Sequence, residues 1–398
     1  MICNFLLEKR KKILMKVLYD PQIFFCQKYG GISRYYFEII NYFYENSEFD
    51  ITFPLLYSDN HYLEKAVFSR HKQFLASKKL DNIQYPRKVF YKIYNNAVNK
   101  INKKFRSNNR SFVKESLEKQ NFDLLHPTYY DPCFLQYLDK KPFVLTIYDM
   151  IQEKFPEGFT GDLASMHKKK LAQKADKIIA ISENTKKDII KFYGIDENKI
   201  EVTYLANSFD INKVQSQQDI KLPEHYILFV GTRGLYKNFK GFIKSIIPLL
   251  NQDNDLKVVS AGGAPFNQEE ATYLEGLGIK EQVLYCPVAD ETLPYFYKNA
   301  KAFIFPSLYE GFGIPVLEAF SCGCPLIVSN TSSLPEVAGD AAVYMDPKNE
   351  DSILESIKSV IYNNSLRQEL INKGYNQVKK FSWQKTAQET KKVYESIL

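Results

Sequence analysis

The stretch that decides the fold is Phe305-Pro-Ser-Leu-Tyr-Glu-Gly-Phe-Gly-Ile-Pro-Val-Leu-Glu-Ala-Phe-Ser-Cys-Gly-Cys-Pro-Leu-Ile-Val-Ser329. The apolar run at 302–305 favours a strand, and the Gly-Phe-Gly of the following loop cannot continue it, because glycine favours tight turns. Pro315 suits the first turn of a helix, Gly323 ends that helix, and a second apolar strand follows at 326–328. The stretch predicts a strand-loop-helix-strand unit.

Two carboxylates, Glu310 and Glu318, flank the loop and helix of this unit. Ligands of a parallel sheet bind at the carboxyl ends of its strands, where the N-terminus of a helix also attracts anions. Carboxylates accept hydroxyl protons, so a pair of them beside an anion site fits a nucleotide sugar. The alternative is an ordinary helix with two solvated glutamates.

The segment resembles the Glu-x7-Glu signature of retaining family 4 glycosyltransferases, which have the GT-B fold. The match covers Glu310-Gly-Phe-Gly-Ile-Pro-Val-Leu-Glu-Ala319 and continues to Gly323-Cys-Pro325. The resemblance implies that Glu310 lies near donor-sugar hydroxyls and that Glu318 holds the nucleotide ribose. It also implies a donor-binding role for the residues between them, namely Gly311, Phe312, Gly313 and Leu317.

Length and composition indicate a folded protein of two domains, with 398 residues and 45% hydrophobic content. No stretch reaches the eighteen or so apolar residues of a membrane span, and the N-terminus does not have the pattern of a secretory signal. We expect residues 1–14 to lie outside the fold and the protein to be cytoplasmic. The six cysteines and five histidines show no metal-binding spacing, and the cysteines are expected to be buried thiols.

Positive charge is concentrated in residues 61–120, where 15 Lys and Arg against 4 Asp and Glu give a net charge of +11. The whole chain has a net charge of +7, so the remaining residues together carry −4. Aromatic residues alternate with these bases, as in Arg87-Lys-Val-Phe-Tyr-Lys-Ile-Tyr94. Such a face suits peripheral contact with anionic lipid on the inner face of a membrane. Solvated helix surface is the alternative, and nucleic acid is disfavoured because no binding motif accompanies the charge.

Strands and helices alternate along both halves of the chain, which predicts two doubly wound α/β domains facing a central cleft. The expected strands lie at 17–19, 51–56, 124–126, 143–148, 177–181, 200–204, 226–230, 256–260, 283–285, 302–305 and 326–328. Helices are expected at 29–43, over much of 60–120, at 183–193 after the N-cap Ser182, and at 239–250. After Ser382 an apolar stripe predicts a terminal helix, and the resemblance implies that it crosses back to the N-terminal domain.

Loops at strand ends carry further candidate donor contacts. Arg233 and Lys237 follow the strand at 226–230 in a glycine loop. The planar guanidinium of an arginine and the ammonium of a lysine could together neutralise a diphosphate. The alternative is that both are ordinary surface residues, as isolated basic residues usually are. The resemblance assigns them to the donor diphosphate, Lys237 more firmly because the usual spacing of the pair is longer. By resemblance, Gly30 and Gly31 face the donor phosphates, and Gly262 and Val288 contact the base. From the residues alone, a lone Gly-Gly turn such as Gly30-Gly31 is more often structural.

His126 and Asp149 are the remaining catalytic candidates. The resemblance places His126 near the donor sugar, whereas a lone histidine is more often structural. Tyr148-Asp149 matches a position where relatives frequently have His-Asp. This chain has Tyr148 in place of the histidine, so we expect no general-base role for a histidine at this position. Asp149 could orient or deprotonate the acceptor hydroxyl.

The sequence therefore predicts an α/β protein of GT-B fold with domains at 15–205 and 223–381, a linker at 206–222 and a crossover helix at 382–398. The expected activity is retaining, metal-independent transfer of a hexose from a nucleoside-diphosphate sugar, with GDP-mannose as the favoured donor. The acceptor is expected to be a hydroxyl of a surface polysaccharide or lipid-linked glycan, and no cofactor is needed. The alternatives are a GT-B epimerase, a phosphorylase, or a non-catalytic protein that binds sugar nucleotides.

Overall fold

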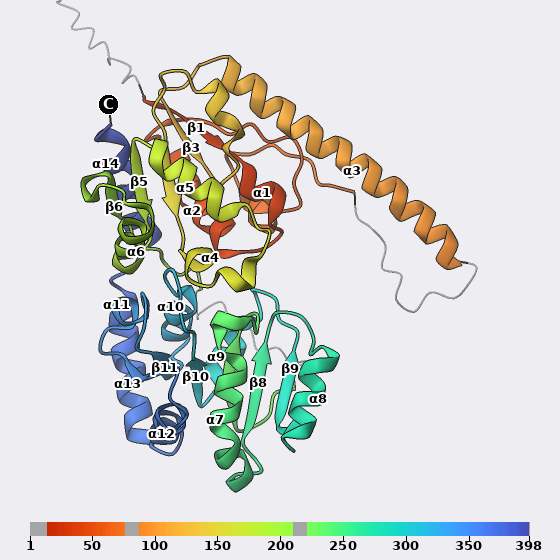
Figure 1. The fold of residues 1–398 in the computed structure, drawn as a ribbon, viewed down its shortest axis with the longest axis vertical. Coiled ribbons are helices and arrows are strands. Elements are labelled where there is room, and N and C mark those ends of the chain that lie inside the picture. The colour runs from red at the N-terminus through yellow and green to blue at the C-terminus, as the bar shows by residue number, and fades with distance from the viewer. Residues whose placement is uncertain (1–13, 76–86, 210–220, 398) are drawn as a thin grey trace, which may run out of the picture. The chain divides into compact units, whose positions relative to one another are not determined.

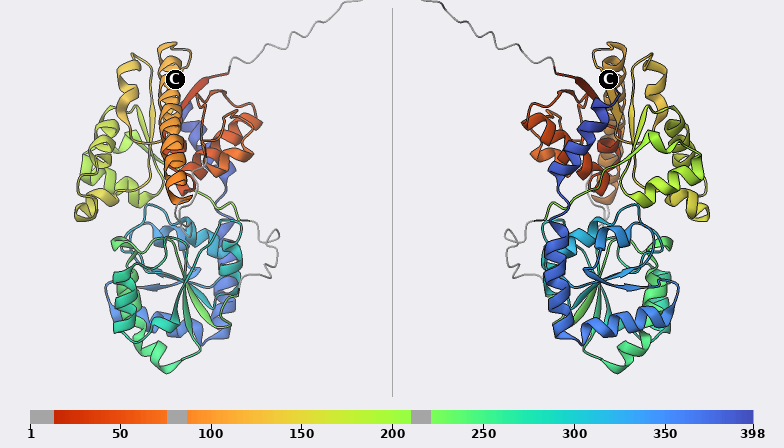
Figure 2. Two further views of the ribbon diagram at one scale, coloured as in Figure 1. Left: turned by 90° about the vertical axis from the view of Figure 1, so that its right-hand side faces the viewer. Right: turned by 90° about the vertical axis from the view of Figure 1, so that its left-hand side faces the viewer.

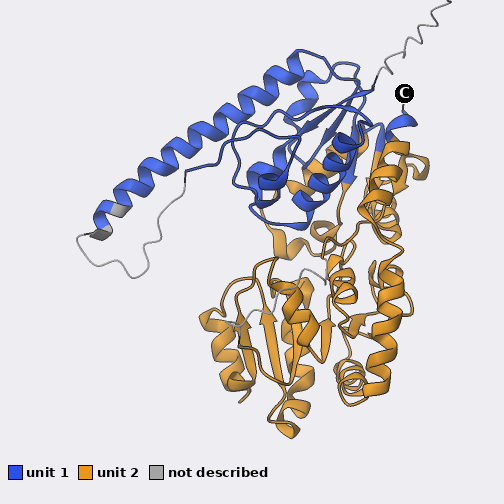
Figure 3. Cartoon of the chain, turned by 180° about the vertical axis from the view of Figure 1, so that it is seen from behind, with its two compact units in different colours: residues 1–146, 174–177, 394–398 blue, residues 147–173, 178–393 orange. Residues whose placement is uncertain are grey.

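A computed structural model describes residues 14–75, 87–209 and 221–397 of the chain. The chain divides into two compact units (Figure 3). Unit 1 comprises Met1–Thr146, Lys174–Lys177 and Tyr394–Leu398, and unit 2 comprises Ile147–Gln173 and Ile178–Val393. The predicted extension at 1–14, the basic segment 61–120 and the linker at 206–222 each fall partly outside the described residues. The predicted domain boundaries stay predictions.

Unit 1 is built on a parallel sheet of order β2-β1-β3, so β1 lies in its centre. A parallel bridge from Leu125 to Phe143 leads from β3 to β4, and β4, β5 and β6 follow in that order in the next sheet. Every residue of β3 and β4 is buried, as expected for strands covered on both faces. The strands of this half of the chain are β1 (Lys16–Asp20), β2 (Asp50–Thr52), β3 (Leu124–Pro127), β4 (Val144–Ile147), β5 (Lys177–Ala180) and β6 (Ile200–Val202). Most of β5 and all of β6 belong to unit 2.

Helices of very different length connect these strands (Figure 1). α2 (Gly31–Glu45) buries one stripe, made of Tyr35, Tyr36, Ile39, Ile40 and Phe43. The remaining helices of this half of the chain are α1 (Gln22–Cys26), α3 (Arg87–Glu118), α4 (Ile151–Lys154), α5 (Ala164–Lys174) and α6 (Glu183–Tyr193).

The second half of the chain forms a six-stranded sheet of order β12-β11-β10-β7-β8-β9, parallel throughout. Figure 2 shows helices on both sides of it. Its strands are β7 (Tyr226–Val230), β8 (Lys257–Ala261), β9 (Val283–Cys286), β10 (Ala302–Phe305), β11 (Leu326–Ser329) and β12 (Ala342–Met345). Its helices are α7 (Phe239–Gln252), α8 (Gln268–Gly276), α9 (Leu293–Asn299), α10 (Ile314–Ser321), α11 (Leu334–Ala338), α12 (Glu350–Ile361), α13 (Asn364–Val378) and α14 (Trp383–Glu395).

Alternate residues of the central strands fill two apolar layers of unit 2. Ile227 and Phe229 of β7 join a buried cluster that includes side chains of α7 and α12. Phe303 of β10 instead packs edge-on against Tyr297 of α9, with 5.1 Å between the ring centroids. The sheet is therefore covered on both faces, which confirms the predicted α/β class and the strand-loop-helix-strand unit at its centre.

Most predicted elements are confirmed, and the largest difference is β2. We expected a strand at 51–56, but β2 ends at Thr52. Pro54 has no backbone N–H to donate to a strand ladder, and the next free amides, of Leu56 and Tyr57, donate to the Asn109 side chain at 3.1 and 2.9 Å. The prediction also omitted β12 and the helices α1, α4, α5, α8, α9, α11, α12 and α13.

The ends of two helices follow the capping residues predicted from sequence. The Ser182 side chain accepts the backbone N–H of Thr185 at the start of α6, and Gly194 ends that helix with φ 66°. Ser382 accepts the N–H of Lys385 at 3.1 Å at the start of α14. The last residues of α14 belong to unit 1, where the hydroxyls of Tyr394 and Tyr19 lie 2.8 Å apart.

Candidate functional site

The loop after β10 brings together two of the predicted site residues. Lys237 Nζ lies 2.7 Å from Glu310 Oε1, and the Ser307 hydroxyl donates to the same oxygen at 2.6 Å. Glu310 is only 8% exposed. β7 and β10 are neighbours in the sheet, so the loops that follow their carboxyl ends meet at one edge. This pair is the centre of the candidate site.

The contact with Glu310 stabilises the positive charge of Lys237. Burial, the largest single influence, would lower the pKa of Lys237, but Glu310 together with Tyr236 and Asp149 raises that pKa above its ordinary value. The Lys237 ammonium is therefore charged throughout the neutral pH range. It also lies 5.3 Å from the centroid of the Phe305 ring, on whose face a cation is favoured.

Glu318 lies on α10 and is 6% exposed. The hydroxyl of Tyr297 donates to Glu318 Oε2 at 3.2 Å. Burial first, and then the Glu318 charge, raises the pKa of Tyr297 well above its ordinary value, so the phenol remains a donor. One carboxylate oxygen of Glu318 is thus oriented from α9.

The backbone of the Glu310 loop is held by hydroxyl groups. The Ser182 and Thr185 hydroxyls both donate to the Gly311 carbonyl, at 2.7 and 3.1 Å. The Ser333 hydroxyl donates to the carbonyls of Glu310 and Phe312, each at 2.9 Å. These bonds fix the loop backbone from Glu310 to Phe312.

Gly311 is required by close packing. A Cβ atom at this position would lie 1.8 Å from the Tyr148 carbonyl oxygen and 2.9 Å from Asp149 Cβ. The structure therefore brings the predicted Tyr148-Asp149 segment directly against the Glu310 loop. Gly313, at the start of α10, has φ 102°, a backbone conformation that favours glycine.

Asp149 is held at the beginning of α4. Its Oδ1 atom accepts the N–H of Ile151, the first residue of that short helix, at 3.0 Å. The buried Lys168 donates to the Asp149 carbonyl at 2.8 Å and also to Glu153 Oε2 at 2.9 Å. Lys168 thus fixes the backbone that packs on Gly311, and sequence reasoning did not identify it.

A second group of predicted residues lies at the carboxyl ends of β7, β8 and β9. Gly231 donates its N–H to the Ala261 carbonyl, and Gly262 donates to the Cys286 carbonyl. Gly262 has φ 78°, and a Cβ there would be 3.3 Å from Val288 Cγ1. The predicted base-contacting residues Gly262 and Val288 are therefore adjacent.

Arg233 is directed toward α8. Its Nε and Nη2 atoms pair with Glu270 at 2.7 and 3.1 Å, and Nη2 also donates to the Ala264 carbonyl. Its guanidinium lies 4.6 Å from the centroid of Phe266. Nη1 is buried without a hydrogen-bond partner among the described residues. The predicted diphosphate contact of Arg233 stays a prediction.

His126 lies in the core of unit 1 and is 0% exposed. Its Nδ1 atom is 2.6 Å from the Tyr394 hydroxyl, and Nε2 is 2.9 Å from Thr146 Oγ1 and 3.2 Å from the Tyr36 hydroxyl. Burial lowers the pKa of His126 to about 3, so the ring is neutral. The geometry favours the structural alternative over the predicted contact with the donor sugar.

The structural role of His126 predicts a specific pH dependence. The unfolded histidine has a pKa of about 6.5 and the folded one about 3, so only the unfolded state binds the proton between these values. Its contribution to stability is present above pH 6.5 and falls by about 1.4 kcal/mol per pH unit below it. The free energy of unfolding of the wild type, relative to His126→Asn, should therefore shrink from pH 7 to pH 4.

The free energy of unfolding must be compared with that of His126→Asn, because the protonation of Asp20 changes stability with pH in the opposite direction. Burial raises the pKa of Asp20 to about 7, so its contribution is present below the unfolded value of about 4 and is lost as the pH rises to 7. Urea unfolding of both proteins across this range isolates the histidine. A constant difference would contradict the assignment.

Gly30 and Gly31 open α2, and both are accessible to solvent. A Cβ at Gly30 would meet only the end of the Gln27 side chain. Nothing in this geometry requires glycine, and the predicted phosphate contact stays a prediction.

Glu336 is a site feature that sequence reasoning missed. Its carboxylate accepts the first N–H groups of α6, from Glu183 at 2.9 Å and Asn184 at 3.1 Å, and the Tyr204 hydroxyl at 3.2 Å. An acid at a helix N-terminus is stabilising. The only sequence signal was its place after a strand, in Ser-Leu-Pro-Glu336.

Three further expectations concern metal-ligand groups, membrane-spanning helices and the burial of the cysteines. Within residues 14–75, 87–209 and 221–397, no group of three or more His, Cys, Asp or Glu is placed to hold a metal ion. No helix in this described part is long and apolar enough to cross a membrane. Cys322 and Cys324 are buried free thiols, but Cys26 and Cys133 are exposed, which corrects the expectation that the cysteines are buried.

Sequence comparison finds two family matches that together cover most of the chain. The family described as Glycosyltransferase Family 4 matches residues 29–206, and Glycosyl transferases group 1 matches residues 210–377. O-antigen chain mannosyltransferase B of Escherichia coli is 30% identical over 64% of this chain and 70% of its own. The N-acetylgalactosamine-N,N'-diacetylbacillosaminyl-diphospho-undecaprenol 4-alpha-N-acetylgalactosaminyltransferase of Campylobacter jejuni is 27% identical over 56% of this chain and 60% of its own.

Structural comparison finds similar folds over nearly the whole chain. HepE of Anabaena, solved with UDP and glucose, aligns with a TM-score of 0.69 at 15% identity, covering 96% of this chain and all of that one. WaaG, a glycosyltransferase involved in lipopolysaccharide biosynthesis, aligns with a TM-score of 0.64 at 13% identity, covering 95% and 99%. The fold is GT-B, as the sequence predicted.

Proposed function

This chain belongs to glycosyltransferase family 4, and we propose that it transfers a hexose from a nucleoside-diphosphate sugar to a glycan hydroxyl with retention of configuration. The observation that carries the proposal is the Lys237–Glu310 pair at 2.7 Å, next to the N-terminus of α10. A cation and the positive end of a helix dipole suit a diphosphate, and a carboxylate suits the hydroxyls of the attached sugar.

The proposed reaction breaks the bond between C1 of the donor sugar and the phosphate oxygen. The electron pair of this bond leaves with the diphosphate, whose growing negative charge is stabilised by Lys237 and by the N–H groups at the start of α10. The acceptor oxygen bonds to C1 from the same face and gives its proton to the departing phosphate oxygen. Glu310 holds sugar hydroxyls, and Asp149, packed against Gly311, orients the acceptor. The protein groups named here supply this stabilisation without a metal ion.

Mannose is the favoured sugar and GDP the favoured nucleotide. The 30% identical relative is named an O-antigen chain mannosyltransferase, which supports mannose and a surface polysaccharide product. The Campylobacter relative is named for an acceptor on diphospho-undecaprenol, which supports a lipid-linked acceptor. We therefore propose a lipid-linked glycan as the acceptor here.

Donor binding is tested by nucleotide-dependent thermal stabilisation. A ligand at 100 times its dissociation constant adds about 2.7 kcal/mol to the free energy of unfolding, and we expect this effect for GDP and GDP-mannose. Glu318→Gln keeps an acceptor for Tyr297 but removes the charge that would bind both ribose hydroxyls, so it should weaken GDP binding about tenfold.

The control is Glu355→Gln, an exposed carboxylate of the same unit on α12, which should bind GDP normally. Equal affinity for GDP in wild type and Glu318→Gln would remove the ribose role. No stabilisation by GDP, UDP or their sugars would contradict the proposed donor class.

The first half of α3 is proposed to contact an anionic membrane surface on the cytoplasmic side. Phe90 and Ile93 are 70% and 64% exposed there. Exposed lysines flank them on the same helix, at Lys92, Lys100, Lys103 and Lys104. Apolar side chains that insert beside lysines suit anionic headgroups, with each base near the surface contributing about 1 kcal/mol.

Vesicle sedimentation tests this contact. We expect the protein to sediment with phosphatidylglycerol vesicles and to remain in solution with phosphatidylcholine vesicles. Phe90→Ser with Ile93→Ser should reduce the bound fraction severalfold, whereas Leu163→Ser, which removes an exposed leucine elsewhere, should not. Unchanged sedimentation of the double variant would contradict the contact.

A further inference from the structure

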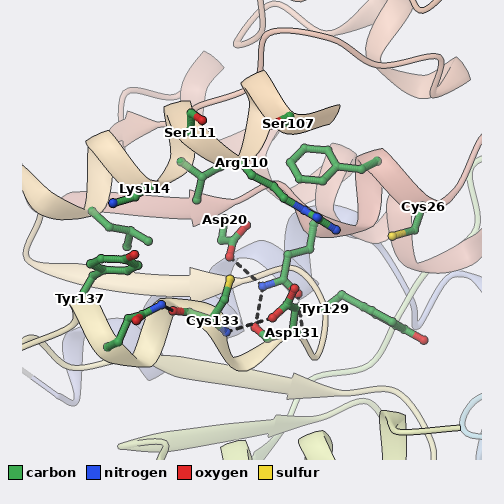
Figure 4. Close-up of a pocket in the computed structure, with 15 residues that line it drawn as sticks. Asp20, Cys26, Ser107, Arg110, Ser111, Lys114, Tyr129, Asp131, Cys133 and Tyr137 are labelled. Carbon is green, nitrogen blue, oxygen red and sulfur yellow. Dashed lines mark hydrogen bonds between the residues drawn. The ribbon is translucent and has the colours of Figure 1, made fainter. Parts of the chain in front are cut away.

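Unit 1 contains a cavity of about 510 Å³ at the carboxyl ends of β1 and β3 (Figure 4). Asp20 ends β1, and Tyr129 and Asp131 follow β3. β1 lies between β2 and β3, so the connections after β1 and β3 diverge to opposite sides of the sheet. Ligands of open α/β sheets bind at such a switch point.

The floor of the cavity carries the carboxyl groups of Asp20 and Asp131, and Gln22 links the Asp20 side chain to the Asp131 backbone. Gln22 Nε2 donates to Asp20 Oδ2 at 2.7 Å and to the Asp131 carbonyl at 2.9 Å, and its Oε1 accepts the Asp131 N–H at 2.8 Å. Burial raises the pKa of Asp20 to about 7, so at neutral pH this group carries only part of a negative charge. The carboxyl oxygens of this floor can accept hydrogen bonds from the hydroxyl groups of a ligand.

The opposite wall is basic and comes from α3. Arg110 and Lys114 lie four residues apart, so both project from one face of the helix, and Figure 4 shows Arg110 extending toward the cavity. The Arg110 guanidinium has no hydrogen-bond or ion-pair partner among the described residues, which distinguishes it from Arg233. Lys114 forms an ion pair with the exposed Glu118, at 3.6 Å. Five N–H donors and an ammonium are thus available for an anion.

Aromatic rings complete the walls. Phe25, Tyr129 and Tyr137 line the cavity, and Lys114 Nζ lies 5.8 Å from the centroid of the Tyr137 ring. Aromatic faces suit the apolar C–H face of a sugar ring, and the cavity is large enough for one monosaccharide and a phosphate. The cavity is therefore lined by two carboxyl groups, three aromatic rings and two basic side chains. This lining suits a ligand with hydroxyl groups at one end and an anionic group at the other.

We propose that this cavity binds the acceptor as a sugar phosphate, with the phosphate on Arg110 and Lys114 and the sugar hydroxyls on Asp20 and Asp131. The proposal rests on the glycosyltransferase function proposed above, in which a lipid-linked acceptor carries its first sugar on phosphate. It adds the residues that recognise that part of the acceptor. Arg110 determines specificity for the phosphate.

The test uses mannose 1-phosphate as the probe and measures its binding by calorimetry. GDP is present at saturation, so that binding to the donor site of unit 2 does not contribute. The variant is Arg110→Gln, which keeps polar bulk but removes the charge. The control is Lys104→Gln, an exposed base on the same helix outside the cavity lining.

We expect Arg110→Gln to weaken mannose 1-phosphate binding at least tenfold and Lys104→Gln to leave it unchanged. Inorganic phosphate and methyl mannoside should each bind at least tenfold more weakly than mannose 1-phosphate, because each engages only one end of the cavity. Competition by a polyprenyl-diphosphate-linked sugar in detergent would identify a lipid-linked source, and competition by free sugar phosphates alone a soluble one.

Equal binding by wild type and Arg110→Gln would overturn the proposal, and so would inorganic phosphate that binds as tightly as mannose 1-phosphate. These results would not affect the donor site, because Lys237→Ala should leave mannose 1-phosphate binding unchanged. Conversely, failure of GDP to bind the wild type would reject the donor site while leaving the cavity test interpretable.

Discussion

Replacement of Lys237 by alanine is expected to lower kcat by about 10²–10³-fold, the loss typical of removing one group that stabilises developing negative charge. In the structure Lys237 Nζ forms the 2.7 Å contact with Glu310 Oε1, and its pKa is raised by that carboxylate. The charge is therefore present before the donor binds. Because most of its effect is exerted on the departing diphosphate, GDP affinity should weaken less than tenfold.

Initial-rate kinetics with the donor and a sugar acceptor measure this effect. The matched control is Lys240→Ala, three residues further along the chain, where an exposed lysine pairs with Glu269 at 2.6 Å. This surface pair contributes little, so kcat should change less than twofold. If Lys237→Ala and Lys240→Ala turn over equally well, Lys237 does not stabilise the leaving group.

Gly311→Ala should damage both folding and turnover. The new Cβ would overlap the Tyr148 carbonyl oxygen at 1.8 Å, and this backbone atom cannot rotate away as a side chain could. The loop or the Tyr148-Asp149 segment must move, at a cost of about 3 kcal/mol or more. Glu310 would be displaced with the loop, and a shift of about 1 Å can lower kcat by about 10²-fold.

Urea unfolding and initial rates measure the two effects. Gly158→Ala is the control, because a Cβ there has no neighbour within 4 Å, so stability should change by less than about 0.5 kcal/mol. A Gly311→Ala enzyme with wild-type stability and kcat would show that the loop is not held against Tyr148.

Local chemistry made much of this fold predictable from sequence. The bounds of α6 were predicted to the residue because Ser182 and Gly194 mark its two ends. The apolar runs at 143–148 and 226–230 were predicted to be strands, and they form β4 and β7. The loop with Glu310 was predictable because glycines interrupt an apolar strand just before a proline-initiated helix.

Long-range partners explain what the sequence could not reveal. Nothing near Arg233 in the chain indicates that Glu270 of α8 will pair with it. The burial of His126 depends on Tyr394, which is 268 residues away. Lys168 and Glu336 likewise act on backbone groups of distant segments. The cavity beside Arg110 required the order β2-β1-β3, which periodicity along the chain does not specify.

A crystal structure with bound GDP-mannose tests the central claim most directly. The account predicts diphosphate oxygens within about 3 Å of Lys237 Nζ and mannose hydroxyls within hydrogen-bond distance of Glu310. It also predicts the ribose hydroxyls on Glu318. A diphosphate bound away from Lys237, with the Lys237–Glu310 contact unchanged and no sugar beside it, would contradict the account.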